Sequence, residues 1–151
     1  MRQILFRGKR VDNDEWVYGF LRCGNYIDVW TPHTWKDEDG NTGEYATVET
    51  YQVDPETVGQ YTGLTDKNGK KIFEGDIVGL EYGDKILSRG DMQFDYGVFG
   101  VEWTGFKKNK GMVGGFGQLH NLRRFDDGLA DRIKVIGNIY DNPELLEVEN
   151  D

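Results

Sequence analysis

The sequence predicts an all-β protein, mainly short strands and turns with one or two short helical turns. The first observation is the spacing of its 21 Gly and 3 Pro, because the longest stretch without either is 11 residues, 44–54. A glycine inside a helix costs about 1 kcal/mol and a proline about 3 kcal/mol, so this spacing leaves little room for a full helix. The second observation is period-two alternation of apolar and polar residues, which is typical of strands. We expect helix in less than about a fifth of the residues.

Alternation predicts an N-terminal β-meander of three strands. Residues 3–7 and 15–22 flank a polar turn, and residues 26–31 follow a second, glycine-containing turn. Trp16 and Trp30 fall on faces of this meander that we expect to point into the core.

The next segment is predicted to hold a loop, a strand and a helical turn. Residues 35–43 are polar and contain two glycines, which favours an exposed loop before a strand at 44–53. Asp54-Pro55 has the order of a helix start, with an Asp cap and proline at the first helical position. Asn142-Pro143 repeats that order near the end of the chain.

The C-terminal half predicts a small SH3-like barrel. Asn68-Gly69 is a strong hairpin signal and would join residues 60–62 to residues 71–73. Glu74-Gly75-Asp76-Ile77-Val78 is similar to the opening strand of SH3-like barrels, an analogy of fold that does not choose a function. Further strands fit residues 76–82, 97–103 and 133–140, and the core residues expected here are Ile77, Trp103 and Ile139.

The 151 residues fit a single domain 1–151, or two β subdomains of about 1–59 and 60–146. Residues 147–151 form an acidic tail that we expect to be frayed. The formal charge is 18 − 27 = −9, so most of the surface would repel duplex nucleic acid. One cysteine excludes an internal disulfide, and no apolar run approaches the roughly 18 residues of a membrane span. These observations predict a soluble intracellular protein that makes no membrane contact.

Three segments of the chain together resemble a known family. They are residues 4–9 with 16–19, residues 60–78 and residues 135–146. In this order they resemble the YopX family, small proteins encoded by bacteriophages and prophages. The resemblance implies a phage gene product in the cytoplasm of the bacterial host and a mostly β fold. It brings no catalytic residue and no cofactor.

Residues with catalytic or metal-binding chemistry are few. His33 and His120 are the only histidines and lie in no nucleophile motif, and Cys23 is expected to be a small buried side chain. A zinc site usually needs four Cys or His, and the chain has three, so we expect no metal. Carboxylate pairs such as Asp126-Asp127 are too common on an acidic chain to indicate catalysis.

The loop 37–44 alternates Asp37, Asp39 and Asn41 and is superficially similar to a calcium loop. The calcium-binding helix-loop-helix motif ends on a ligating Glu and has flanking helices. Here Val48 takes that position and strands flank the loop. We therefore predict a solvated acidic turn.

The segment 104–125 contains five cations and no Asp or Glu, a local charge of +5, and it also contains Phe106, Phe116 and His120. Such a composition suits a nucleic-acid single strand or another anion, and it equally suits a mobile loop with solvated lysines. The candidate contacts are Lys107, Lys108, Lys110, Arg123 and Arg124.

The leading hypothesis is a phage or prophage accessory protein, not an enzyme, that docks onto an unidentified phage or host protein. One alternative is a link to nucleic acid, either through the basic segment or by mimicry of DNA with the acidic surface. The other is an enzyme that works through carboxylates. Formation of a homo-oligomer is left open.

Overall fold

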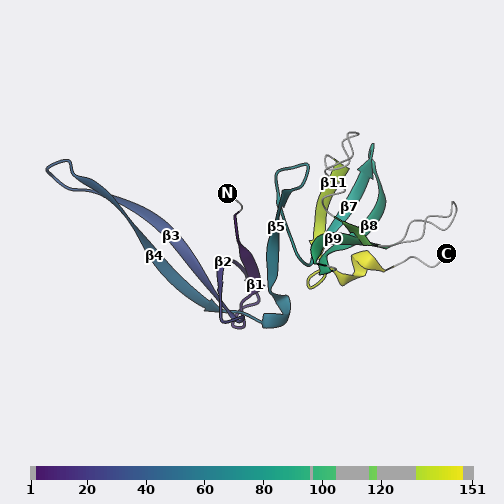
Figure 1. Ribbon diagram of the computed structural model, residues 1–151, viewed down its shortest axis with the longest axis horizontal. Coiled ribbons are helices and arrows are strands. Elements are labelled where there is room, and N and C mark those ends of the chain that lie inside the picture. The colour runs from purple at the N-terminus through teal and green to yellow at the C-terminus, as the bar shows by residue number, and fades with distance from the viewer. Residues whose placement is uncertain (1–2, 96, 105–115, 119–131, 148–151) are drawn as a thin grey trace. The chain divides into compact units, whose positions relative to one another are not determined.

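The computed structural model confirms the all-β fold and describes residues 3–95, 97–104, 116–118 and 132–147 (Figure 1). About 65% of the described residues lie in strands and 7% in helical turns, which is within the expected limit. They divide between two compact units, Gln3–Gln60 and Tyr61–Asp151.

The first unit is an antiparallel sheet in the order β4-β3-β2-β1, and the start of β5 pairs with β1. The one helical turn, η1, begins at Pro55, and the Asp54 carboxylate accepts a hydrogen bond from Glu56 N–H at 3.0 Å. This confirms the predicted cap. The elements are β1 (Phe6–Lys9), β2 (Trp16–Arg22), β3 (Tyr26–Lys36), β4 (Thr42–Gln52), η1 (Pro55–Thr57) and the start of β5, a strand that spans Gly59–Thr65.

The buried side of this sheet carries two glycines and two aliphatic side chains. Ile27 and Val53 are 0% and 1% exposed, and Gly8 and Gly19 are buried beside them. A Cβ atom on Gly19 would lie 2.2 Å from the carbonyl oxygen of Asp28, so the close approach of β2 and β3 requires glycine at this position.

The prediction that the tryptophans of the meander point into the core is wrong for Trp30, which is 57% exposed. Trp16 is half-buried, and the guanidinium of Arg7 lies 4.6 Å from its ring centroid. Period-two alternation tells which residues share a face, but it does not tell which face is inside. The inner face here is the one with Gly19 and Ile27.

β3 and β4 continue as a two-stranded ribbon well beyond the end of β2 (Figure 1). β2 pairs only with Tyr26–Asp28, whereas β3 and β4 pair without a register shift from Tyr26↔Gln52 to Lys36↔Thr42. The predicted loop 35–43 is therefore too long, because both of its ends are strand. The turn itself is closed by Asp37, whose carboxylate accepts hydrogen bonds from the backbone and side-chain N–H of Asn41 at 2.8 and 2.7 Å.

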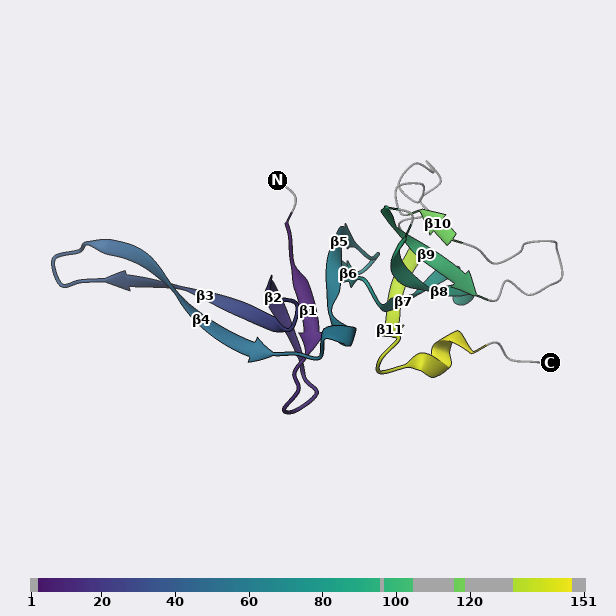
Figure 2. The same cartoon turned by 60° about the horizontal axis from the view of Figure 1, so that its bottom comes forward.

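The second unit contains a five-stranded antiparallel sheet in the order β10-β9-β8-β7-β11 (Figure 2). The end of β5 and β6 form a separate hairpin, in which Tyr61 pairs with Phe73 as predicted. Strand β8 lies where the sequence predicted none. The elements are β6 (Lys71–Phe73), β7 (Asp76–Tyr82), β8 (Lys85–Asp95), β9 (Val98–Thr104), β10 (Phe116–Gln118), β11 (Ile133–Asn138) and the helical turn η4 (Pro143–Leu146).

The β5–β6 hairpin packs its apolar side chains against this sheet. Ile77 is 0% exposed, as predicted, while Trp103 and Ile139 are half-buried. Among the described strands no pairing joins β10 to β11, so the SH3-like barrel is not confirmed. The main core cluster is Ile72, Val78, Met92, Val101, Ile133 and Val135, with Leu64, Leu80, Phe99 and Trp103 packed around it.

Candidate functional site

The distal part of the β3–β4 ribbon is the most unusual surface of the described chain. We call residues 29–49 the arm, because they lie beyond the last residue of β3 that pairs with β2. None of these residues is buried, and only Val29, His33 and Gly43 are even half-buried. Both faces of the arm are therefore open to solvent. An isolated two-stranded ribbon is marginally stable in water, so its exposed side chains need an explanation.

An apolar stripe runs along one face of the ribbon. Residues directly opposite each other on antiparallel strands share a face, and Trp30 is opposite Val48 while Pro32 is opposite Ala46. The ring of Phe20, from β2, meets the Trp30 ring edge-on with centroids 6.2 Å apart. Phe20, Trp30 and Val48 are 54%, 57% and 47% exposed. We call the five residues Phe20, Trp30, Pro32, Ala46 and Val48 the stripe.

The other face of the arm carries a smaller aromatic group. His33 stacks on Tyr45 with ring centroids 4.9 Å apart, and its Nε2 lies 2.9 Å from the hydroxyl of Thr47. Trp35 packs over Gly43, where a Cβ atom would lie 2.5 Å from the indole nitrogen. His33 thus takes part in cross-strand contacts that stabilise the ribbon.

The arm is acidic. It contains one lysine, Lys36, against five carboxylates, a formal charge of −4. Within the described part of the chain no cation forms an ion pair with Glu38, Asp39 or Glu44. The pKa of the Asp37 carboxyl is held below its ordinary value, and the largest cause is the hydrogen bond from the Asn41 side chain. The arm therefore presents apolar and negatively charged groups together.

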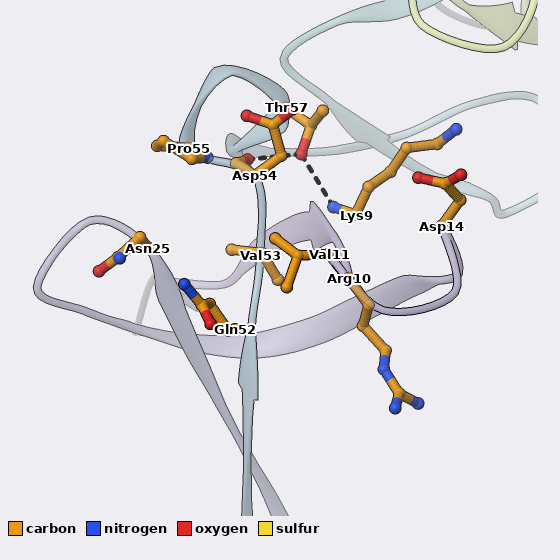
Figure 3. Close-up of a pocket in the computed structure, with 10 residues that line it drawn as sticks. All are labelled: Lys9, Arg10, Val11, Asp14, Asn25, Gln52, Val53, Asp54, Pro55 and Thr57. Atoms are coloured by element: carbon orange, nitrogen blue, oxygen red, sulfur yellow. Dashed lines mark hydrogen bonds between the residues drawn. The ribbon is translucent and has the colours of Figure 1, made fainter.

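A pocket of about 330 Å³ lies at the other end of the first unit (Figure 3). Two of its polar groups have partners: Lys9 N–H donates to the hydroxyl of Thr57 at 2.9 Å, and that hydroxyl donates to the Asp54 carbonyl at 2.7 Å. The Arg10 side chain points away from the other lining residues (Figure 3) and binds Asp12 at 2.5 and 2.9 Å. These contacts are structural. The lining residues are Lys9, Arg10, Val11, Asp14, Asn25, Gln52, Val53, Asp54, Pro55 and Thr57.

The candidate anion contacts of the sequence lie outside the described residues, as do His120 and Asp126-Asp127. Cys23 was expected to be buried and is instead exposed, because it occupies the β2–β3 turn with a φ of 54°. The described residues contain no cluster of three or more His, Cys, Asp or Glu side chains suited to a metal. They also contain no helix long and apolar enough to span a membrane. The undescribed candidates are Lys107, Lys108, Lys110, Arg123 and Arg124.

Sequence reasoning missed the stripe as a surface feature. The alternation in residues 16–30 placed Phe20 and Trp30 on faces carrying other aromatic residues, but large aromatic side chains were taken to be core. The sequence signal for the inner face was Gly19, because a glycine inside a strand marks a place where another backbone approaches closely.

Comparison with known proteins gives both a family and a fold. The chain is similar to the protein EF1440 from Enterococcus faecalis in its crystal structure, with a TM-score of 0.55 and 24% identity over 97% of this chain and 100% of that one. At this identity the likeness shows the fold alone. No curated protein matches the sequence. The family model for YopX protein matches residues 5–147, nearly the whole chain, and we conclude that the protein belongs to the YopX family.

Proposed function

We propose that this protein acts by binding another protein and that the arm is its recognition element. The observation that carries the proposal is the stripe. Phe20 on β2 and Trp30 and Val48 on the arm are each about half exposed, and no other described strand pairs with residues 29–49. Contiguous apolar patches on a protein surface mark interaction sites, and aromatic side chains contribute most of the energy at such sites. A partner that covers the stripe also stabilises the ribbon.

The proposed setting is the cytoplasm of a bacterial host, where a phage or prophage accessory protein meets a phage or host protein. The membership of the YopX family and the single cysteine support this setting. The proposed activity is docking without chemical turnover.

Mimicry of DNA is a weaker alternative because of where the arm carboxylates lie. Glu44 is on the face of the stripe, being opposite Thr34, whereas Glu49 is opposite Val29 on the other face. Carboxylates divided between two faces do not form a row like that of a phosphate backbone. Binding of single strands through the basic segment 104–125 is a second candidate, favoured by its local charge of +5.

The test is capture of the partner by tagged protein from phage-infected cells, followed by repetition with purified components. The stripe variant Trp30→Ser with Val48→Thr should lose the partner that the wild-type protein retains. The matched control is Tyr82→Ser with Leu87→Thr, because these side chains are 61% and 50% exposed but belong to the second unit. Circular dichroism of both variants checks that they remain folded. Equal retention of the partner by all three proteins contradicts the proposal.

A further inference from the structure

The outer edge of β4 carries a row of backbone groups that no other described strand pairs with. β4 is the first strand in the sheet order. Val53 N–H donates to the carbonyl of Asn25 at 2.9 Å, toward β3, whereas the carbonyl of Gln52 accepts from Val11 N–H at 3.1 Å, on the other side. Successive residues of an antiparallel strand direct their backbone groups to opposite edges, and β3 and β4 pair without a register shift. The backbone groups that point away from β3 are therefore those of residues 44, 46, 48 and 50.

This edge has little of the usual protection against the addition of another strand. Proteins block exposed edges with charged side chains, lysine above all, and with proline, bulges or short strands. β4 has eleven residues, Thr42–Gln52, with no proline, no lysine and no bulge, so its protection is limited to the charges of Glu44 and Glu49. The free edge of β3 does have such protection, because Pro32 lies opposite Ala46 at a position whose nitrogen points away from β4. Of the two edges of the arm, the β4 edge is therefore the one suited to an added strand.

Charge decides what kind of strand fits. Glu44 and Glu49 lie on β4, and the whole arm has a formal charge of −4. A second copy of the same edge would bring two acidic arms together and is disfavoured. A strand with lysine or arginine opposite these two glutamates would be attracted, and apolar side chains opposite Ala46 and Val48 would extend the stripe.

We propose that the outer edge of β4 binds an extended, basic segment of the partner protein as an added antiparallel β-strand. This inference rests on the proposed docking function and defines its partner. Six residues of the bound segment lie opposite residues 49 to 44 of β4, in that order. Their expected pattern is a cation opposite Glu49, apolar residues opposite Val48 and Ala46, a second cation opposite Glu44, and any residue at the two other positions. Main-chain hydrogen bonds supply the attachment, and the alternating side chains supply the selectivity.

The experiment titrates the labelled full chain with two peptides while backbone amides are followed by NMR. The basic probe is acetyl-Lys-Val-Thr-Val-Thr-Lys-amide, and the acidic probe replaces both lysines with glutamate. The basic probe should shift the amides of Glu44, Ala46, Val48 and Thr50 and slow their hydrogen exchange. The amides of Tyr45, Thr47 and Glu49, which face β3, should change much less. We expect the acidic probe to bind at least about tenfold more weakly.

Two variants separate edge addition from other modes of binding. Ala46→Pro removes one outward N–H without removing a bond to β3 and should abolish binding of the basic probe, whereas the matched control Thr34→Pro changes the edge of β3 and should retain it. Glu44→Lys with Glu49→Lys should reverse the preference between the two probes.

The proposal is overturned if the outward amides fail to respond to the basic probe, if both probes bind equally, or if Ala46→Pro binds as well as the wild-type protein. It is also overturned if sedimentation shows a dimer whose outward β4 amides are protected without peptide, because the occupant is then a second copy. A partner lost by the stripe variant but kept by Ala46→Pro contradicts edge addition and leaves docking through the stripe intact. A partner kept by both variants contradicts the docking function as well.

Discussion

Asp66 shows how one buried carboxylate organises the second unit. It is 6% exposed and accepts hydrogen bonds from the backbone N–H of Asn68, Lys70 and Val135 at 2.8, 2.9 and 3.0 Å. Burial alone would raise the pKa of Asp66, but these three donors favour the ionised form and hold its pKa below the ordinary value. The same side chain therefore closes the β5–β6 turn and attaches it to β11.

Replacement of Asp66 by Asn should lower the free energy of unfolding by roughly 2–3 kcal/mol at neutral pH, because an amide has one acceptor oxygen and directs N–H groups at a donor. The pKa of Asp66 is lower in the folded protein than the value of about 3.9 in an unfolded chain. Its contribution is therefore complete above the unfolded pKa and is lost as the pH falls through the folded pKa.

The difference in the free energy of unfolding between the wild-type protein and this variant should narrow as the pH falls below about 4. Urea denaturation followed by circular dichroism at a series of pH values measures this difference. A gap that stays constant down to the acid unfolding of both proteins would show that ionisation of Asp66 is not the source of the stability.

At the scale of the strands, two large apolar side chains in regular β positions should behave differently. Trp30→Ala should change the free energy of unfolding by no more than about 1 kcal/mol, because Trp30 is 57% exposed on β3. Ile77→Ala should cost about 2–5 kcal/mol, because Ile77 is 0% exposed on β7. Thermal and urea unfolding of both variants makes the comparison. A loss at Trp30 as large as that at Ile77 would mean that the stripe is covered within the folded protein.

Strands and caps could be predicted where local chemistry decides them. β7 has the predicted bounds, Asp76–Tyr82, and the Asp54 cap forms as expected. The Asn68-Gly69 turn lies where it was predicted, but it is not the two-residue hairpin turn that Asn-Gly favours, in which both residues have positive φ. Gly69 has a φ of 79°, whereas Asn68 is not among the described residues with positive φ. The Asp66 side chain organises that turn instead, by accepting from the N–H groups two and four residues ahead. Its third hydrogen bond, from Val135, joins distant parts of the chain and could not be predicted from local sequence.

The arm and its stripe were missed, for physical reasons. A ribbon solvated on both faces has no need of apolar–polar alternation, so polar residues such as Lys36 and Thr42 were assigned to a loop although they pair with each other. The inner face of β2 contains Gly19, and a missing side chain gives no hydrophobic signal. Strand β8 was also missed, because its alternation is interrupted by Gly90 and by charged residues.

For the molecule as a whole, the charge of −9 sets which partners can approach. The acidic arm carries −4 of it and favours a basic protein segment, whereas the sequence 104–125 carries +5 and is the part of the chain suited to an anion. These two features make opposite demands on a ligand. A protein partner and a nucleic-acid partner can therefore be told apart by where mutations weaken binding and by the response to salt.

If the basic segment binds a nucleic-acid single strand, the affinity should fall with salt with a log–log slope of about −0.7 per phosphate contact, or about −3.5 for all five cations. Replacement of Lys107, Lys108 and Lys110 by Gln should make the slope shallower by about 2, because three contacts are lost. The matched control replaces Lys70, Lys71 and Lys85, which are exposed and described in the second unit, and should leave the slope unchanged. Fluorescence anisotropy with labelled DNA and RNA single strands measures both effects. Absence of binding by the wild-type protein at low salt, where attraction between cations and phosphates is strongest, would exclude free nucleic acid as the ligand. An equally shallow slope in the control variant would assign the effect to net charge rather than to this segment.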